Sequence, residues 1–425
     1  MTASEREFFF APAVVEGRVW YARGHVSPAQ AEYDFTEEYD LESRDLKGGP
    51  PAVLLSGLIT RSETPQTLLP NGRVIYSRID QAETYHGGSL WEIWADPRSG
   101  QAKSKARRIA DWPDFEIWGL SATADGQRLA FVRAQALTSV YVADLEGNGF
   151  RIVDPQRLTL SDSEDHAYDW TSDSKSVLFD SNRNGTWDIF RQALDQRMAE
   201  KLVASPGGSI RPALSPDGAS VLYLTPSTEP GFHPPLKIMR VALTGGPPQF
   251  LGDIQGSGEI RCARTANLCV VSDVSSKQQT LYALDPVKGK AGEPLMMGPA
   301  SDPSEGADWD VCPDGSSLAF IRSAVQSGAS QIEIRPLAGG APRRQLNLSG
   351  RVNVLYFRWA ADAKGWYVTA SSPSGSILLK VDLTGKAQQL MQGYTWGDAI
   401  ASPDQHHVAI MGRALTSNVW MLENF

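Results

Sequence analysis

The chain has 425 residues, and its 40 lysine and arginine residues stand against 49 aspartate and glutamate residues, a net charge of −9. Because no basic cluster breaks this balance, a nucleic-acid partner for this chain is not expected. The 41% apolar content is typical of a globular protein, and no apolar run approaches the ~18 residues that a membrane-spanning helix needs.

The N-terminal residues, MTASEREFFFAPAVVEGR, lack the basic start and apolar stretch of a secretory signal. The chain as written is therefore expected in the cytoplasm. An extracytoplasmic location is expected instead if the chain is part of a membrane-anchored signalling protein.

A short turn followed by alternating apolar residues recurs along the chain. In LSPDGASVLYL the proline presets the first turn position, Asp217 can bond its own backbone, and the glycine supplies a permissive position. The equivalent turn residues are Glu16, Asn71, Asp125, Asp173, Asp217, Asn267, Asp314, Asp362 and Asp404. Their spacings of 42 to 55 residues are close to the roughly 40–50 residues of propeller blades, so nine repeat units are predicted.

Each unit is predicted to contain four strands and no helix. After the turn and a strand such as VLYL comes a second hairpin, for which Asn184-Gly185 is a strong signal, and then strands such as DIFRQ and PQFLG. The prediction is an all-β fold: a single propeller domain over residues 1–425 with eight to nine four-stranded blades. A β-sandwich with coincidentally regular turns is the alternative.

The ninth unit ends at NVWMLENF without its last strand. We expect the N-terminal segment EFFFAP to complete it, so that the chain termini close the ring. Closure of this kind removes exposed sheet edges.

The turn-and-strand pattern SPDG…LAF and the hairpin SNRNGTWDIF resemble the TolB-like propeller repeat, which is related to the propellers of dipeptidyl-peptidase-type enzymes. This resemblance covers nearly the whole chain and implies a propeller. CARTANLCVVSD, YALDPVKGK, DWDVCPDGSSLAFI and NVWMLENF are also similar to propeller regions that follow winged-helix or serine/threonine-kinase domains in bacterial signalling proteins. This second resemblance covers mostly residues 260–425, and the sequence contains neither a winged helix nor a kinase signature.

The first strand of each blade lines the central channel of a propeller. Positions three and five before the turn residue are largely apolar, as in Tyr168, Trp309 and Val311, and are expected to pack between blades. Positions four and six alternate with them. These positions contain charged residues that we expect to converge near the channel mouth: Asp169, Arg211, Arg261, Asp308, Asp310, Arg358 and Asp398.

Two interpretations of these charges stay open at this stage. They could neutralise one another as bridges between blades, or they could form a polar pocket for a small anion or a peptide, since arginine binds carboxylate and phosphate bidentately. Trp118 and Trp396, near strand starts, are further candidates for contact with a ligand.

Cys262 and Cys269 flank a short turn symmetrically. They are expected to lie opposite each other across a hairpin, either as a disulfide or as two buried thiols. No cysteine and histidine spacing typical of a metal site is present, and His406 and His407, as neighbours on a strand, face opposite ways. No metal or cofactor is expected.

A nucleophile elbow of the G-x-S-x-G type is also missing from the sequence. We therefore expect a monomeric, non-catalytic module that binds or senses a protein, a peptide or a small anionic ligand, as the sensory or interaction part of a bacterial signalling protein. The alternatives are a lyase or hydrolase with its site at the channel mouth, and a periplasmic assembly partner of the TolB kind.

Overall fold

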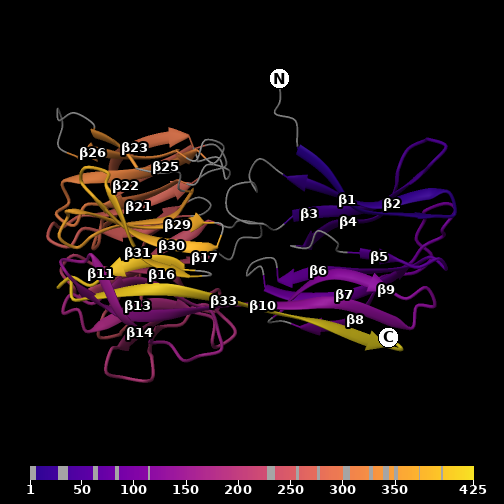
Figure 1. The fold of residues 1–425 in the computed structure, drawn as a ribbon, viewed down its shortest axis with the longest axis horizontal. Helices are drawn as coiled ribbons and strands as arrows, with labels where there is room; N and C mark the ends of the chain where they lie inside the picture. Colours follow the sequence, from indigo (N-terminus) through magenta and orange to yellow (C-terminus); the bar gives the residue numbers. More distant parts are fainter. Residues whose placement is uncertain are drawn as a thin grey trace. The chain divides into compact units, whose positions relative to one another are not determined.

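The computed structural model describes residues 6–26, 37–60, 66–81, 86–112, 115–226, 235–254, 258–274, 278–299, 307–324, 329–337, 344–348, 353–372, 374–393 and 396–425. In these ranges the regular structure consists of β-strands, which confirms the predicted fold class (Figure 1). No helix in the described residues is long and apolar enough to cross a membrane. Contacts divide the chain, for which one domain was predicted, into two compact units, residues 1–136 with 415–425 and residues 137–414.

The first unit contains two four-stranded antiparallel sheets and part of a third. The first sheet has the order β1 (Arg6–Val15), β2 (Arg18–Val26), β3 (Glu37–Asp45), β4 (Ala52–Thr60), and the second has the order β5 (Gln66–Leu68), β6 (Arg73–Gln81), β7 (His86–Trp94), β8 (Arg107–Trp112). β9 (Glu116–Ala122) pairs with the beginning of β10 (Arg128–Glu146). The two full sheets share a core in which the buried Tyr39 donates its hydroxyl to the carbonyl of Ser77 at 2.7 Å.

The second unit contains five sheets whose strands follow the chain order. They are β12 (Asp165–Trp170), β13 (Ser176–Ser181), β14 (Asp188–Ala193), β15 (Glu200–Val203); β16 (Ile210–Leu214), β17 (Ser220–Pro226), β18 (Leu236–Ala242), β19 (Gln249–Ile254); β20 (Ile260–Cys262), β21 (Cys269–Val274), β22 (Gln278–Asp285), β23 (Gly289–Pro299); β24 (Ala307–Val311), β25 (Ser317–Ala324), β26 (Ala329–Pro336), β27 (Arg344–Asn347); and β28 (Asn353–Trp359), β29 (Gly365–Ser372), β30 (Gly375–Asp382), β31 (Ala387–Gly393).

A sixth sheet of this unit joins strands that are distant in the sequence. Its order is β32 (Trp396–Ala401), β33 (His407–Glu423), β10, β11 (Arg151–Arg157). The residues of β10 and of β33 are divided between the two units.

The six first strands of the second unit form a closed ring. β12, β16, β20, β24, β28 and β32 lie next to one another in this order, and β32 lies beside β12. The indole N–H of Trp170 in β12 donates to the carbonyl of Ile400 in β32 at 2.8 Å. The second unit is thus a propeller of six four-stranded blades, fewer than the eight to nine predicted for a single ring.

Each of the nine predicted turns joins the first and second strands of a repeat, as Asp217 does between β16 and β17. The nine repeats nevertheless form eight sheets, because β10 and β11 of the third repeat complete the sheet of the ninth. The expectation that EFFFAP completes it is wrong, since β1 lies at the edge of the first sheet and pairs with β2. The 19-residue length of β10 explains the difference, because such a strand can pair with β9 near its start and with β11 near its end.

The turn sequence has a defined bonding pattern. The hydroxyl of Ser215 donates to Asp217 Oδ1 at 2.5 Å, and the same oxygen accepts the amide N–H of Ala219 at 3.0 Å. Gly218 follows with a φ of 70°, which a glycine adopts without strain. Thr171 and Asp173, and Ser402 and Asp404, form the same hydroxyl–carboxylate contact, each at 2.6 Å.

Candidate functional site

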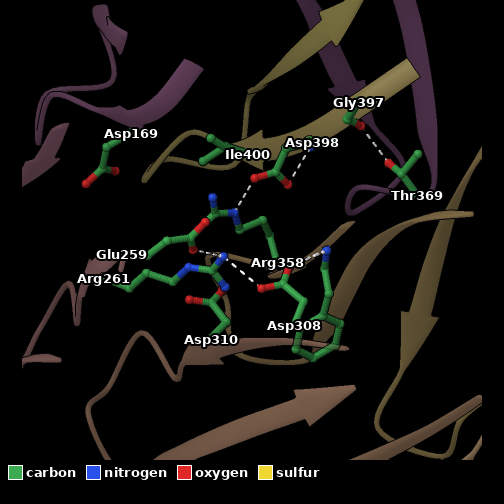
Figure 2. Close-up of polar contacts among 12 residues, drawn as sticks. Asp169, Glu259, Arg261, Asp308, Asp310, Arg358, Thr369, Gly397, Asp398 and Ile400 are labelled. Carbon is green, nitrogen blue, oxygen red and sulfur yellow. Dashed lines mark hydrogen bonds and ion pairs between the residues drawn. The ribbon is translucent and has the colours of Figure 1, made fainter. Parts of the chain in front are cut away.

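The seven predicted charged residues all lie on the first strands of the second unit. Their strands are β12 for Asp169, β16 for Arg211, β20 for Arg261, β24 for Asp308 and Asp310, β28 for Arg358 and β32 for Asp398. The close-up in Figure 2 shows six of them around one region, with Arg261 and Arg358 among the carboxylates. The two-residue alternation of the strands therefore does bring these charges together.

Three of the carboxylates tie one first strand to the next. In each case one oxygen accepts the amide N–H of the following residue, and the other accepts an amide N–H from the neighbouring first strand. These inter-strand bonds run from Leu214 to Asp169 at 2.9 Å, from Phe357 to Asp308 at 3.1 Å and from Trp359 to Asp310 at 2.7 Å. The bonds from the following residue come from Trp170, Trp309 and Val311, each at 2.8 Å. These aspartates therefore have a structural role.

Arg358 and Asp398 form a buried ion pair between β28 and β32. The Nε of Arg358 donates to Oδ2 of Asp398 at 2.5 Å, and Oδ1 accepts the amide N–H of Ala399 (Figure 2). Burial lowers the pKa of Arg358, but the carboxylates of Asp398 and Asp310 outweigh it and raise that pKa. The guanidinium is therefore charged at any physiological pH.

Arg261 is the most unusual member of the set. Its Nη2 contacts both Glu259 Oε2, at 2.5 Å, and Asp308 Oδ1, at 2.9 Å (Figure 2). The residue is only 6% exposed, yet neither its Nε nor its Nη1 has a hydrogen-bond partner among the described residues. Buried donors without partners are rare and costly, so this guanidinium has donors for an acceptor that the described residues do not provide.

The pKa values of the two carboxyl groups that contact Arg261 are shifted in opposite directions. Burial raises the pKa of Glu259, but Arg261, Arg358 and Arg211 outweigh burial and hold that pKa below its usual range. For Asp308 burial is the stronger effect, and it raises the pKa of this carboxyl despite the attraction of Arg261. Glu259 is thus the firmly ionised partner of Arg261.

Arg211 enters the site from an irregular part of β16. Its φ is 56°, in the left-handed region, and the register with β17 shifts between Ile210 and Ala213. The amide N–H of Arg211 donates to Asp180 Oδ2 at 3.0 Å, and its Nη1 donates to the carbonyl of Gly258. This β-bulge points the guanidinium to the segment that carries Glu259 and Arg261.

These side chains line a cavity of about 60 Å³, several times the roughly 10–15 Å³ that one water molecule requires. Four arginines and three acidic residues contribute to its wall, a net charge of +1 when all are ionised. The charged wall residues are Arg211, Arg261, Arg264, Arg358, Asp169, Glu259 and Asp310. Asp308 and Asp398 contact Arg261 and Arg358 and are not part of the wall.

Two charged side chains and one tyrosine of the wall were not predicted as site residues. Glu259 lies two residues before Arg261, so its side chain is on the same side of the extended chain. Extending the series of alternating charged positions by two residues would have found it. Tyr168, expected to pack between blades, lies at a register shift between Ala167 and Asp169. Arg264 follows the short β20 and reaches Asp169 Oδ1 at 3.2 Å.

The two predicted tryptophans are not part of this cavity wall. Trp118 lies on β9 in the first unit. Trp396 begins β32 and packs edge-on against Tyr141 of β10, with 5.7 Å between ring centroids. Its surroundings are those of a packing residue.

Cys262 and Cys269 lie directly opposite each other in β20 and β21 and form a disulfide. Cys262 lines the cavity beside Arg261, whereas Cys312 is a free, buried thiol. Among the described residues no group of three or more histidine, cysteine, aspartate or glutamate side chains is placed to hold a metal ion.

No family model matches the chain, and no curated protein matches it in sequence. Solved structures similar to it include TolB from Acinetobacter baumannii, with 13% identity over 81% of this chain and 82% of that one and a TM-score of 0.46. An oligogalacturonate lyase from Vibrio parahaemolyticus has 11% identity over 70% of this chain and 96% of that one, with a TM-score of 0.39. A puromycin-hydrolyzing peptidase from Mycobacterium tuberculosis has 14% identity over 91% of this chain and 53% of that one, with a TM-score of 0.38. These similarities are too low to indicate a function for this chain.

Proposed function

We propose that the second unit is a non-catalytic binding module whose ring cavity takes a carboxylate group of a small ligand or of a peptide partner. The observation that carries this proposal is the pair of donors, Nε and Nη1, on the buried Arg261 that have no hydrogen-bond partner among the described residues. Each of these charged donors can form a charge-assisted hydrogen bond to a carboxylate oxygen.

The size and charge of the cavity support a small monoanionic group. A volume of about 60 Å³ accepts the head of a ligand but not a whole metabolite or peptide. The wall itself has a net charge of +1, but Asp308 and Asp398 behind it pair with Arg261 and Arg358, so a group with a single negative charge is more compatible with the site than a phosphate dianion. The remainder of the ligand would extend out of the cavity.

The bonding of the acidic residues favours binding over catalysis. A general acid or base needs a carboxyl oxygen that can reach the substrate. Asp308 has a raised pKa, as a general acid would, but its two oxygens accept bonds from Trp309, Phe357 and Arg261. The alternative of a lyase or hydrolase at the channel mouth therefore has less support from this geometry.

The wider role that we propose is the sensory or interaction part of a bacterial signalling protein. It rests on the similarity of residues 260–425 to propeller regions of such proteins, together with the proposed binding of a carboxylate ligand in the cavity. A role as a periplasmic assembly partner would use the same cavity for a peptide carboxylate.

The test compares the binding of acetate and of inorganic phosphate by isothermal titration calorimetry in the wild type, Arg261→Lys and Arg191→Lys. Lysine keeps the positive charge beside Glu259 and Asp308 but lacks the Nε and Nη1 donors, so the fold should persist while acetate affinity falls about tenfold, as expected for a lost charge-assisted bond. Arg191, in an exposed ion pair with Glu200, is the matched control and should bind like the wild type.

Two results would overturn the proposal. One is that the wild type binds neither acetate nor a longer monocarboxylate such as butyrate. The other is that Arg261→Lys binds acetate as tightly as the Arg191→Lys control. Tighter binding of phosphate than of acetate would contradict the monoanion assignment.

A further inference from the structure

The backbone of Arg211 is exceptional among the first strands. Several residues other than glycine have a positive φ. Three of them lie in the turns between first and second strands, directly after the turn aspartate: Ser174, Ala363 and Gln405. Among the described first-strand residues, Arg211 is the one that has this conformation inside a strand. A left-handed conformation costs an L-residue roughly 1–2 kcal/mol, so surrounding contacts have to maintain it.

Asp180 supplies the contact that maintains this conformation. It lies on β13, the second strand of the preceding blade, and it is 1% exposed. Its Oδ2 accepts the amide N–H of Arg211 at 3.0 Å. The inter-strand ties described above come from aspartates on first strands, including Asp169 of the same blade, so this tie from a second strand is distinct and coincides with the bulge.

His166 in turn contacts Asp180. The two residues are directly opposite each other in β12 and β13, and Nδ1 of His166 lies 3.3 Å from Oδ1 of Asp180. The imidazole also lies 3.5 Å from Glu164 Oε2 and stacks on Trp187, with 5.0 Å between ring centroids. Burial lowers the pKa of His166, but Asp180 and Glu164 outweigh it and raise this pKa to about 9. The ring is therefore a cation at neutral pH and compensates the buried charge of Asp180.

We propose that His166 and Asp180 form a positioning pair, which holds the Arg211 backbone in its left-handed conformation and so directs the Arg211 guanidinium to the cavity. This inference rests on the proposed carboxylate-binding function. Neither residue of the pair lines the cavity, so neither is expected to touch the ligand. Their effect on affinity would pass through Arg211 alone.

The experiment measures acetate affinity by calorimetry and the melting temperature for the wild type, Asp180→Ala and Asp180→Asn. Asparagine keeps an oxygen that can accept the Arg211 amide N–H, whereas alanine removes it. We expect Asp180→Ala to lose about tenfold in acetate affinity, as for a misplaced charge-assisted bond, and Asp180→Asn to recover most of that affinity. A residue that only stabilises the fold would change the melting temperature without this rescue.

A second pair of variants decides the matter if Asp180→Ala does not fold. His166→Gln keeps an N–H that can reach Asp180, and His166→Ala does not, so the alanine variant should bind acetate more weakly than the glutamine variant. Equal affinities of Asp180→Ala and Asp180→Asn would overturn the positioning role, and where Asp180→Ala does not fold, equal affinities of His166→Ala and His166→Gln would overturn it.

The outcomes separate the two proposals. If the wild type binds no carboxylate, the proposed function fails, and the positioning role fails with it. If the wild type binds acetate and Arg261→Lys loses that binding, while Asp180→Ala and His166→Ala keep it, the function stands and the positioning role is wrong.

Discussion

Arg358 and Asp398 are joined by a 2.5 Å bond across two neighbouring first strands, and both side chains are almost fully buried. In Arg358→Met the carboxylate of Asp398 would stay buried without its cation. We expect a loss of about 3–5 kcal/mol in the free energy of unfolding of the second unit, measured by urea denaturation. In Arg358→Met/Asp398→Leu the carboxylate left without its cation is removed as well, and most of this loss should be recovered.

The exposed pair of Arg191 and Glu200 provides the control for this prediction. Arg191→Met should cost less than about 1 kcal/mol, because exposed ion pairs contribute little. If Arg358→Met were no more destabilising than Arg191→Met, the buried pair would have no special role in joining β28 to β32.

Lys380 predicts a pH dependence of stability. The residue is 3% exposed, and its Nζ lies 4.2 Å from the ring centroid of Tyr367. Burial lowers its pKa from 10.5 to about 8, although Asp362 opposes this shift. Between about pH 8 and 10.5 the unfolded chain binds a proton that the folded protein has lost, so the contribution of Lys380 to stability becomes more favourable as the pH rises through this window.

Lys380→Met removes this titration. The variant should be more stable than the wild type below pH 8, by on the order of 1–3 kcal/mol, and the difference should shrink toward pH 10.5. Chemical denaturation of both proteins between pH 7 and pH 10.5 tests this, and a difference that does not change with pH would contradict it.

The disulfide between Cys262 and Cys269 should stabilise the second unit and support the cavity. β20 has only three residues, and the disulfide links the residue after Arg261 covalently to β21. The double variant Cys262→Ser/Cys269→Ser should lose about 2 kcal/mol, as expected for a short loop, and bind acetate more weakly. Urea denaturation and calorimetry measure the two effects.

Cys312→Ala controls for the loss of a buried cysteine outside the bond. A reducing agent should lower the stability of this variant and of the wild type alike, but leave the double variant unchanged. An equal response of all three proteins to the reducing agent would refute a stabilising disulfide.

Closure of the six-blade ring by β10 predicts that this strand is sensitive to proline. The amide N–H of Leu145 donates to the carbonyl of His406 at 2.8 Å, and its side chain packs in a core with Ala401 and Val408. Leu145→Pro should therefore destabilise the second unit by about 3 kcal/mol or more. Arg151→Pro, at the start of the outer strand β11, is the control and should cost much less. Similar melting temperatures for the two variants would argue against β10 as a central strand.

The sequence predicts the repeats well because each one contains its own turn chemistry. The contacts of Ser215, Asp217 and Gly218 are local, so a pattern of hydroxyl, aspartate and glycine is sufficient to recognise them. The same holds for the charges on the first strands, where the alternation of residues is regular. These features need no knowledge of what lies elsewhere in the chain.

The missed features depend on irregular or distant structure. Tyr168 was assigned to interblade packing because alternation was assumed through a position where the register shifts. The partner of the ninth repeat was misassigned because pairing between β33 and β10 joins residues that are far apart in sequence, and no local pattern specifies it. Whether Nε and Nη1 of Arg261 have hydrogen-bond partners depends on all the residues around this side chain, and these come together only in the folded ring.

The adjacency of β10 and β33 has a consequence for the evolution of the chain. The second unit begins within one of these strands and ends within the other, and the two pair in one sheet. A segment whose two ends lie side by side can be inserted into a host protein, or removed from it, without forcing the host's flanking residues apart. The six-blade ring therefore has the geometry of a cassette that recombination can transfer as a whole.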